Sequence, residues 1–221
     1  MKPCFSVPRV TLMAAGLLLL LSPGLAKAQD CGLPADYFQI DGDFFSSDDA
    51  VDWALGLSGS GVFDNQGLPL LTPAFHDRDE HWAGNQSDPD AFASSNKNND
   101  YIGSADDPWK WGGGSGPAKN DLTDVYAHSA MLDGNLWLFL GATTRSNNGA
   151  SHIDFEFNQQ GYTQSGTTSG TIVGNGTDGG RTSNVDFIVS VDYTDGGNVP
   201  VVTCRQWQAV GDHFEFVLMN G

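Results

Sequence analysis

The feature that most constrains the fold is a series of short segments whose apolar and polar residues alternate with a period of two. In residues 152–158, Ile153, Phe155 and Phe157 alternate with polar side chains. Residues 185–193 follow the same pattern. Because successive side chains of a strand point to opposite faces, this alternation predicts strands that are buried on one face.

Further strand-like segments flank these two, and glycine, asparagine or aspartate residues that favour turns separate them. They occupy residues 135–141, 199–207 and 214–218. The first of them is apolar on both faces, as in a strand inside a sandwich core. Only residues 47–55 suggest a helical turn, with Ser46 or Ser47 as its N-cap.

The composition supports a β-rich chain. Glycine accounts for 28 of the 221 residues, and glutamate occurs only at positions 80, 156 and 215. Few glutamates and lysines disfavour helices, whereas abundant glycine, asparagine and threonine suit turns and strands. We therefore predict an all-β fold, an antiparallel β-sandwich with jelly-roll-like connectivity, that forms a single domain over residues 29–221.

The first 28 residues have the pattern of a secretory signal peptide. Lys2 and Arg9 precede an apolar run at residues 12–21, and Ala26 and Ala28 form a small-residue cleavage site. The alternative is a membrane anchor, but the run is shorter than the ~20 residues of a membrane span. We predict cleavage after Ala28 and a secreted or extracellular protein, with display at the cell surface left open and no membrane association after cleavage.

The charge balance excludes two classes of partner. The chain has 10 lysine and arginine residues against 27 acidic residues, which gives a net charge of -17. Binding to nucleic acid or to an anionic membrane surface requires a basic face. We therefore expect neither nucleic acid nor a membrane surface as a partner.

Two cysteines remain after the predicted cleavage, because Cys4 belongs to the leader. In an exported chain, Cys31 and Cys204 are candidates for one disulfide, which would tie the mature N-terminus to a late strand. The alternative is a pair of free buried thiols.

Most catalytic signatures are absent from the sequence. There is no G-x-S-x-G, no phosphate-binding glycine loop after a strand, and no zinc cluster of C-x-x-C type. Asp154 and Glu156 lie on one face of a predicted strand, ~7 Å apart by strand rise, which would suit an inverting glycosidase pair. The alternative is that they form the polar outer face of a half-buried strand.

Acidic clusters suggest a bound cation. Asp41 and Asp43 lie on a predicted turn, and Asp121 belongs to a later cluster. Carboxylate oxygens are ligands that Ca²⁺ prefers, so we predict Ca²⁺ as a structural cofactor of these residues. The alternative is solvated acidic loops that keep the protein soluble. His76 and His81 could hold a transition metal, or could simply lie at the surface.

Residues 56–120 are predicted to form a long loop-rich region, in which isolated aromatic residues occur among glycine, asparagine, aspartate, serine and proline. Trp82, Trp109 and Trp111 lie there. Sugars stack on exposed aromatic rings, and nearby aspartate and asparagine side chains bind their hydroxyls, so these tryptophans are candidate ligand-binding residues. The alternative is that they seal the ends of the sandwich.

Several stretches resemble DOMON-like β-sandwiches of the type found in family 9 carbohydrate-binding modules. They are Ile40-Asp-Gly-Asp-Phe44 with Asp52-Trp53, residues 119–127 and residues 133–141. The set is still more similar to secreted surface proteins of bacteria, through Trp109-Lys-Trp111, Phe155-Glu-Phe-Asn-Gln159 and residues 191–197. The resemblance implies a jelly-roll-like sandwich in an exported protein, and no set of sugar-binding residues is carried over with it.

These observations lead to three hypotheses. The first is an exported, non-catalytic β-sandwich that is stabilised by Ca²⁺ and binds a polysaccharide or a cell-surface glycan. The second is a structural or adhesive head domain of a bacterial cell-surface protein, without a small-molecule ligand. The third is a polysaccharide hydrolase that uses Asp154 and Glu156.

Overall fold

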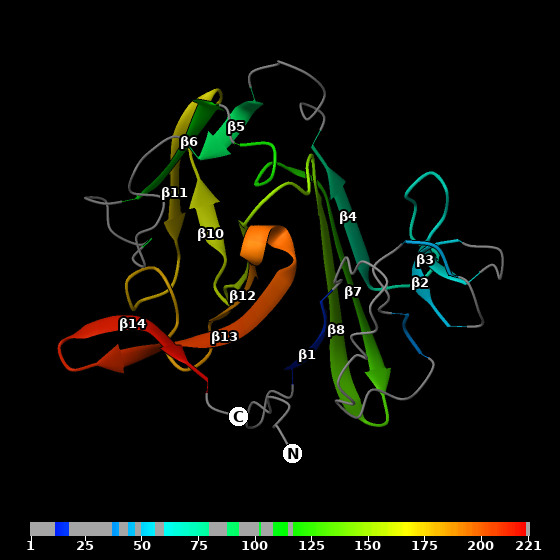
Figure 1. Cartoon of the computed structure of the whole chain (residues 1–221). Coiled ribbons are helices and arrows are strands. Elements are labelled where there is room, and N and C mark those ends of the chain that lie inside the picture. The colour runs from blue at the N-terminus through cyan, green and yellow to red at the C-terminus, as the bar shows by residue number, and fades with distance from the viewer. Residues whose placement is uncertain are drawn as a thin grey trace. The chain divides into compact units, whose positions relative to one another are not determined.

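The computed structural model shows an all-β protein built mainly from antiparallel sheets, which confirms the predicted sandwich-like fold class (Figure 1). The residues that it describes are 12–17, 37–39, 44–46, 50–55, 60–79, 88–92, 102, 108–114 and 117–219. Among them, no helix is long and apolar enough to span a membrane.

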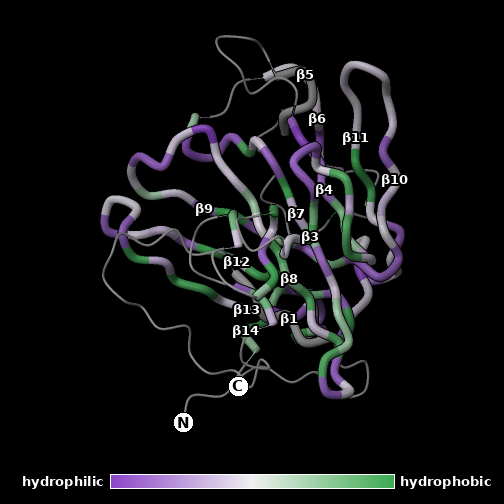
Figure 2. Tube along the Cα trace, turned by 90° about the vertical axis from the view of Figure 1, so that its right-hand side faces the viewer, coloured by the Kyte–Doolittle hydropathy of each residue, from purple (hydrophilic) through white to green (hydrophobic). Residues whose placement is uncertain are grey.

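Within the described ranges, the strands fall into four sheets. The first eight are β1 (Leu12–Leu17), β2 (Asp52–Ala54), β3 (Gly61–Phe63), β4 (Ala74–Arg78), β5 (Asp88–Phe92), β6 (Trp109–Gly114), β7 (Leu122–Leu132) and β8 (Asn135–Thr144). The rest are β9 (Ser151–Phe157), β10 (Tyr162–Gln164), β11 (Ser169–Gly174), β12 (Phe187–Thr194), β13 (Val199–Val210) and β14 (His213–Leu218), with a 3₁₀ turn η2 (Asp195–Gly197) before β13. In Figure 2, hydrophobic residues lie within the strands and several of the turns between strands are hydrophilic.

The chain divides into two compact units, and each is described by itself. Unit 1 comprises Met1–Asp79 and Leu122–Thr144 with Gly221, and unit 2 comprises Glu80–Asp121 and Arg145–Asn220. Unit 1 contains a sheet of order β1-β8-β7-β4 and the short parallel pair β2-β3. β7 and β8 form a long antiparallel hairpin, whereas β1 pairs with β8 in parallel.

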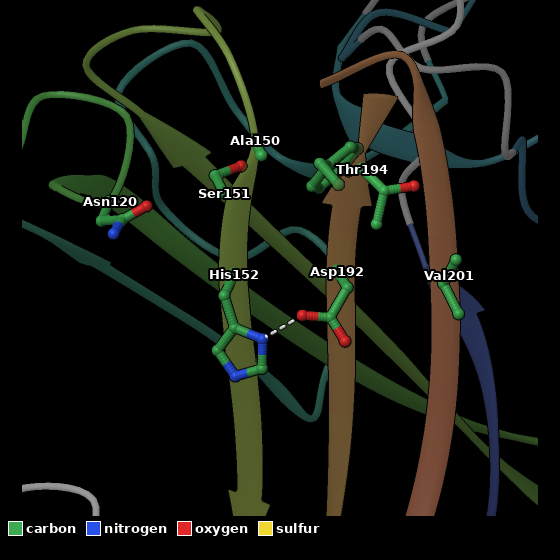
Figure 3. Close-up of a pocket in the computed structure, with 8 residues that line it drawn as sticks. Asn120, Ala150, Ser151, His152, Asp192, Thr194 and Val201 are labelled. Atoms are coloured by element: carbon green, nitrogen blue, oxygen red, sulfur yellow. Dashed lines mark hydrogen bonds and ion pairs between the residues drawn. The ribbon is translucent and has the colours of Figure 1, made fainter. Parts of the chain in front are cut away.

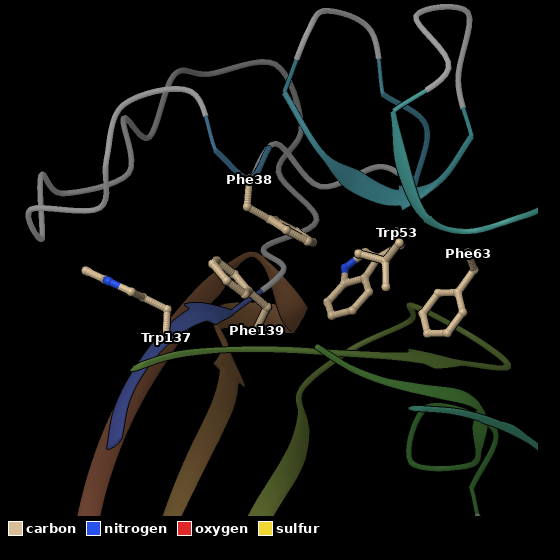
Figure 4. Close-up of a cluster of buried hydrophobic side chains, with 6 residues drawn as sticks. Phe38, Trp53, Phe63, Trp137 and Phe139 are labelled. Carbon is tan, nitrogen blue, oxygen red and sulfur yellow. The ribbon is translucent and has the colours of Figure 1, made fainter. Parts of the chain in front are cut away.

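The core of unit 1 is a cluster of aromatic side chains (Figure 4). Phe38 stacks on Phe139 with ring centroids 4.5 Å apart and meets Trp53 edge-on at 5.0 Å. Gly141 of β8 leaves room for this packing, because a β-carbon there would lie 3.1 Å from the Trp53 ring. The alternation of β8 therefore places its bulky residues against a core that chain segments near residues 38 and 53 complete.

The helical turn predicted for residues 47–55 is wrong where the structure describes it, because Asp52–Ala54 form strand β2. The Val51 and Ala54 amides donate to the carbonyls of Tyr37 and Phe44, so tertiary backbone hydrogen bonds replace helical ones. Residues 47–49 lie outside the described part of the chain.

Unit 2 contains two antiparallel sheets, of order β10-β11-β6-β5 and β14-β13-β12-β9. Trp109 and Trp111, expected in a loop, lie in β6, where Trp111 pairs with Gly170 of β11. The glycine-rich stretch at 161–180 supplies the β10–β11 hairpin beside them. The local composition predicted a loop, but pairing with a strand about sixty residues away makes this segment a strand.

A buried arginine joins the two sheets of unit 2. Arg181 is 1% exposed, and its guanidinium lies 4.9 Å from the ring centre of Trp207, 4.8 Å from Phe216 and 5.7 Å from Trp109. Its Nε donates to Glu156 Oε1 at 2.7 Å. Since Trp109 belongs to one sheet and Trp207 and Phe216 belong to the other, the Arg181 guanidinium contacts aromatic rings of both sheets.

Candidate functional site

The candidate site is an open pocket in unit 2 of about 430 Å³, called here the His152 pocket. It lies where β9 begins and β12 ends, beside a turn that precedes β7 (Figure 3). It is lined by Asn120, Ala150, Ser151, His152, Asp192, Tyr193, Thr194 and Val201.

The register of two strands brings the polar side chains of this pocket together. β9 and β12 are antiparallel, and His152 lies directly opposite Asp192. Asp154, opposite Ser190, is two residues further along β9 and therefore on the same face. The alternation that predicts the two strands thus also creates this polar face, but only the register pairs its members.

His152 bridges two carboxylates, of which Figure 3 shows the contact with Asp192. Its Nδ1 is 2.5 Å from Asp192 Oδ1, and its Nε2 is 2.8 Å from Asp154 Oδ2. Partial burial by itself lowers the pKa of His152, but hydrogen bonds to Asp192 and Asp154 and their negative charges outweigh it, so the pKa is raised above 6.5. In the protonated ring, both N–H groups donate to carboxylate oxygens.

Other polar groups of the pocket are free to meet a ligand. Among the residues that the structure describes, the second carboxylate oxygen of Asp192, the Asn120 carboxamide and the Ser151 hydroxyl make no hydrogen bond. They supply acceptors and donors around one opening. Thr194 differs, because its hydroxyl donates to the Val199 carbonyl at 3.1 Å.

An apolar surface borders these polar groups. Val201 lines the pocket opposite Asp192 in the β12–β13 register, and Val199 pairs with Thr194. Both valines are more than two-fifths exposed. Tyr193 lines the pocket as well, and burial raises the pKa of its phenol, which therefore stays neutral at physiological pH. The pocket combines an apolar wall with a few polar groups, as small-molecule sites do.

One local and two long-range polar contacts hold the Asn120 turn in place. The Asn120 amide donates to the Pro117 carbonyl at 2.8 Å. The Lys119 ammonium donates to the Ala150 carbonyl, and Asp121 forms an ion pair with Arg145 at 3.1 Å. These contacts on both sides of Asn120 fix its backbone beside the start of β9.

Two turns next to the pocket-lining residues approach each other closely through their backbones. In η2, Gly197 adopts a φ of 95°, and a β-carbon there would lie 2.6 Å from the Gly149 carbonyl oxygen. Glycine is therefore required at this position. The contact ties the turn after β12 to the turn before β9.

The predicted ligand-binding tryptophans are not part of this pocket. Trp82 lies outside the described residues. Trp111 is only 9% exposed, and its indole N–H donates to the Ser165 carbonyl at 2.9 Å. Trp109 packs near Arg181. Trp109 and Trp111 thus contribute to the packing of unit 2, a placement that gives the Trp111 ring little surface for stacking on a sugar.

The predicted metal ligands are not brought together in the described part of the chain. Asp41 and Asp43 lie outside it, and Asp121 is the carboxylate that pairs with Arg145. Among the described residues, no group of three or more histidine, cysteine, aspartate or glutamate side chains could hold a metal ion. His76 lies 3.0 Å from Asp124, and His81 is not described. The Ca²⁺ site therefore stays a prediction.

The predicted disulfide also stays a prediction. Cys204 is a free thiol in this structure, and its Sγ lies 3.4 Å from the Met219 sulfur. Burial raises the pKa of this thiol to about 11, so it is protonated at neutral pH. Cys31 lies outside the described residues.

Both carboxylates of the proposed hydrolase pair are already engaged. Glu156 accepts from Arg181, and its side chain is only 14% exposed. Asp154 accepts from His152. A glycosidase needs one carboxyl that can donate a proton and one free carboxylate beside the sugar. Because Glu156 is paired with a buried guanidinium, it suits neither the role of proton donor nor that of the free carboxylate.

Sequence reasoning missed Asp192 and Asn120. Both lie in strand or turn segments of ordinary composition, and only the register and the fold of the 117–121 turn bring them beside His152. The one signal in the sequence was the alternation shared by residues 152–158 and 185–193. It shows which side chains lie on the same face of each strand, but not which residues of the two strands lie opposite one another.

No family model, curated protein or solved structure matches this chain.

Proposed function

We propose that this protein is an exported, non-catalytic β-sandwich module that binds a glycan in the His152 pocket. The observation that carries the proposal is the combination, in one open pocket, of unpaired polar groups with an exposed apolar wall. Asp192 and Asn120 supply unpaired polar groups, and Val201 supplies part of the apolar wall. The resemblance of residues 40–44, 52–53, 119–127 and 133–141 to carbohydrate-binding sandwiches is a likeness of fold, and it carries over no sugar-binding residues.

The chemistry of a pyranose fits this surface. Neighbouring hydroxyls of a sugar ring can share one carboxylate or carboxamide, such as Asp192 or Asn120, and its C–H face can pack on an apolar wall. A volume of about 430 Å³ falls in the usual range for small-ligand sites. The openness of the pocket suits a chain that enters and leaves along the surface.

The charge of the protein favours neutral glycans. With a net charge of -17, the protein repels uronate-rich or sulfated polysaccharides at low ionic strength. The free carboxylate oxygen of Asp192 adds local repulsion toward an anionic sugar. We expect neutral polysaccharides to bind and polyanionic ones not to bind.

A non-catalytic role follows from what the carboxylates already do. Glu156 is held by Arg181, and both nitrogens of His152 are held by Asp154 and Asp192. A general acid or base must be within reach of substrate and able to exchange its proton. Of these groups only Asp192 lines the pocket with a free oxygen, which is suited to hydrogen bonding.

The proposal is tested by isothermal titration with soluble mixed-linkage β-glucan, xylan and galactomannan, with alginate as the polyanionic comparison. We expect saturable binding to at least one neutral polymer and none to alginate. Asn120→Ala should weaken that binding by about two- to tenfold, because one hydrogen bond is lost. Asn65→Ala, in an exposed turn of unit 1, is the matched control and should bind as the parent protein does.

A second pair of variants tests the apolar wall. Val201→Asp should weaken or abolish binding, whereas Val185→Asp alters a valine of almost equal exposure that does not line the pocket. Equal effects of the two changes would refute the proposed site. If none of the polymers binds, the structural or adhesive head domain becomes the better account, and release of reducing sugar would favour the hydrolase.

A further inference from the structure

We propose that His152 is a positioning residue: its cation bridges Asp154 and Asp192, aligns the free oxygen of Asp192 for the ligand, and makes glycan binding weaken as the pH rises. This inference rests on the proposed glycan-binding function and adds the regulation of the same site.

The geometry requires a charged ring. Asp192 Oδ1 and Asp154 Oδ2 lie at opposite nitrogens of one imidazole, at 2.5 and 2.8 Å. A neutral imidazole carries one N–H, so it could donate to only one of these carboxylates and would turn a lone pair toward the other. The arrangement is therefore satisfied only by the protonated ring, in which both contacts are charge-assisted hydrogen bonds.

The bridge determines how Asp192 meets the pocket. Figure 3 shows one oxygen of Asp192 directed at the His152 ring and the other turned away from it. Among the residues that the structure describes, this second oxygen has no hydrogen-bond partner. When His152 loses its proton, it can donate to only one of the two carboxylates. In the tautomer that keeps the proton on Nε2, Asp192 loses its hydrogen bond and gains rotational freedom that the ligand must then restrict.

The other charged groups near the pocket are lysine, arginine and aspartate side chains rather than histidines. They are Lys119, which donates to Ala150, the Asp121–Arg145 ion pair, and Asp195 in η2. Lysine, arginine and carboxyl groups have ordinary pKa values well outside pH 6–9. The residue opposite Asp192 on β13 is the uncharged Val201, so His152 is the group that changes charge.

The direction of the pH dependence follows from the protonated form. Hydrogen bonds to two carboxylates raise the pKa of His152 above 6.5, so the bridging cation persists at and somewhat above that pH. Binding is strongest below this range and declines as the pH rises through the raised pKa. Because the His152 side chain is half exposed and those of Asp154 and Asp192 are about two-fifths exposed, we expect a decline of about two- to fivefold between pH 5.5 and pH 9.

The test measures the affinity for whichever of the three neutral polymers binds, at pH 5.5, 7 and 9. His152→Gln should bind two- to fivefold more weakly at pH 5.5 and show no decline toward pH 9. His213→Gln is the matched control, because His213 is equally exposed and flanked by Asp212 and Glu215 but does not line the pocket. It should retain the pH dependence of the parent protein.

An NMR titration of the His152 ring, without ligand, provides a second readout. Asp192→Asn and Asp154→Asn should each lower the midpoint of this titration, whereas Asp212→Asn should not. Two results would overturn this inference without contradicting the glycan site. One is binding by the parent protein that does not depend on pH, and the other is a His152→Gln variant with the same pH dependence as the parent protein. Absence of binding to every polymer at every pH would overturn the proposed function, and the role of His152 with it.

Discussion

At the scale of single residues, Arg181 illustrates how a buried charge is accommodated. Three aromatic rings surround its guanidinium, and Glu156 accepts from Nε, while Nη1 is buried without a hydrogen-bond partner among the described residues. Taking a charge out of water is costly, and a buried pair regains that cost only with good geometry. Arg181 therefore contacts both sheets of unit 2, but its ion pair with Glu156 need not add to the net stability of the fold.

This account predicts different outcomes for breaking the pair and for replacing it. Glu156→Ala should lower the free energy of unfolding by about 3–5 kcal/mol, because the arginine is left buried without its counter-charge. The double change Arg181→Met with Glu156→Leu should remain within about 2 kcal/mol of the parent, because apolar groups then fill the site. Urea unfolding measures both, and equal losses for the two proteins would contradict the assigned role of the ion pair.

At the scale of elements, the strands of unit 2 depend on close backbone packing. Gly170 of β11 pairs with Trp111, and a β-carbon at this position would lie 1.8 Å from the Ser165 carbonyl oxygen, which accepts the Trp111 indole N–H. Glycine in a strand often marks such an approach. The β10–β11 hairpin therefore has no room for a side chain here.

Gly170→Ala should accordingly destabilise the protein by about 1–3 kcal/mol, since the Ser165 carbonyl must move. The hydrogen bond to Trp111 should weaken at the same time, and the change in tryptophan environment should appear in the fluorescence spectrum. Ser169→Ala, an exposed neighbour in the same strand, serves as the control and should change stability by less than about 0.5 kcal/mol. A stable Gly170→Ala protein with unchanged fluorescence would contradict this packing.

Elements also show how far the sequence could predict this protein. Alternation in residues 152–158 and 185–193 correctly predicted two strands and the residues that share a face. It could not predict that His152 lies opposite Asp192, because register depends on the turns and on distant pairing. For the same reason, the segment with Trp109 and Trp111 had the composition of a loop, although long-range pairing makes it β6.

At the scale of the whole molecule, charge is the dominant property. A net charge of -17 is spread over 221 residues, and the described acidic side chains lie on strands and turns of both units. Like charges repel one another in the compact state more than in the expanded chain. Salt at 0.15 M reduces the range of this repulsion to about 8 Å.

Two solution measurements separate this general repulsion from a specific cation site. Raising NaCl from 10 to 300 mM should increase the melting temperature, because screening relieves repulsion within the folded chain. If Asp41 and Asp43 hold Ca²⁺, millimolar CaCl₂ should raise the melting temperature further than NaCl of equal ionic strength does. At a hundredfold excess of Ca²⁺ over its Kd, the additional stabilisation corresponds to about 2.7 kcal/mol in the free energy of unfolding. Asp41→Asn with Asp43→Asn should remove only that excess, while Asp212→Asn with Asp133→Asn, an equal change in charge, should keep it. Identical shifts with both salts would show that screening alone acts on the acidic clusters.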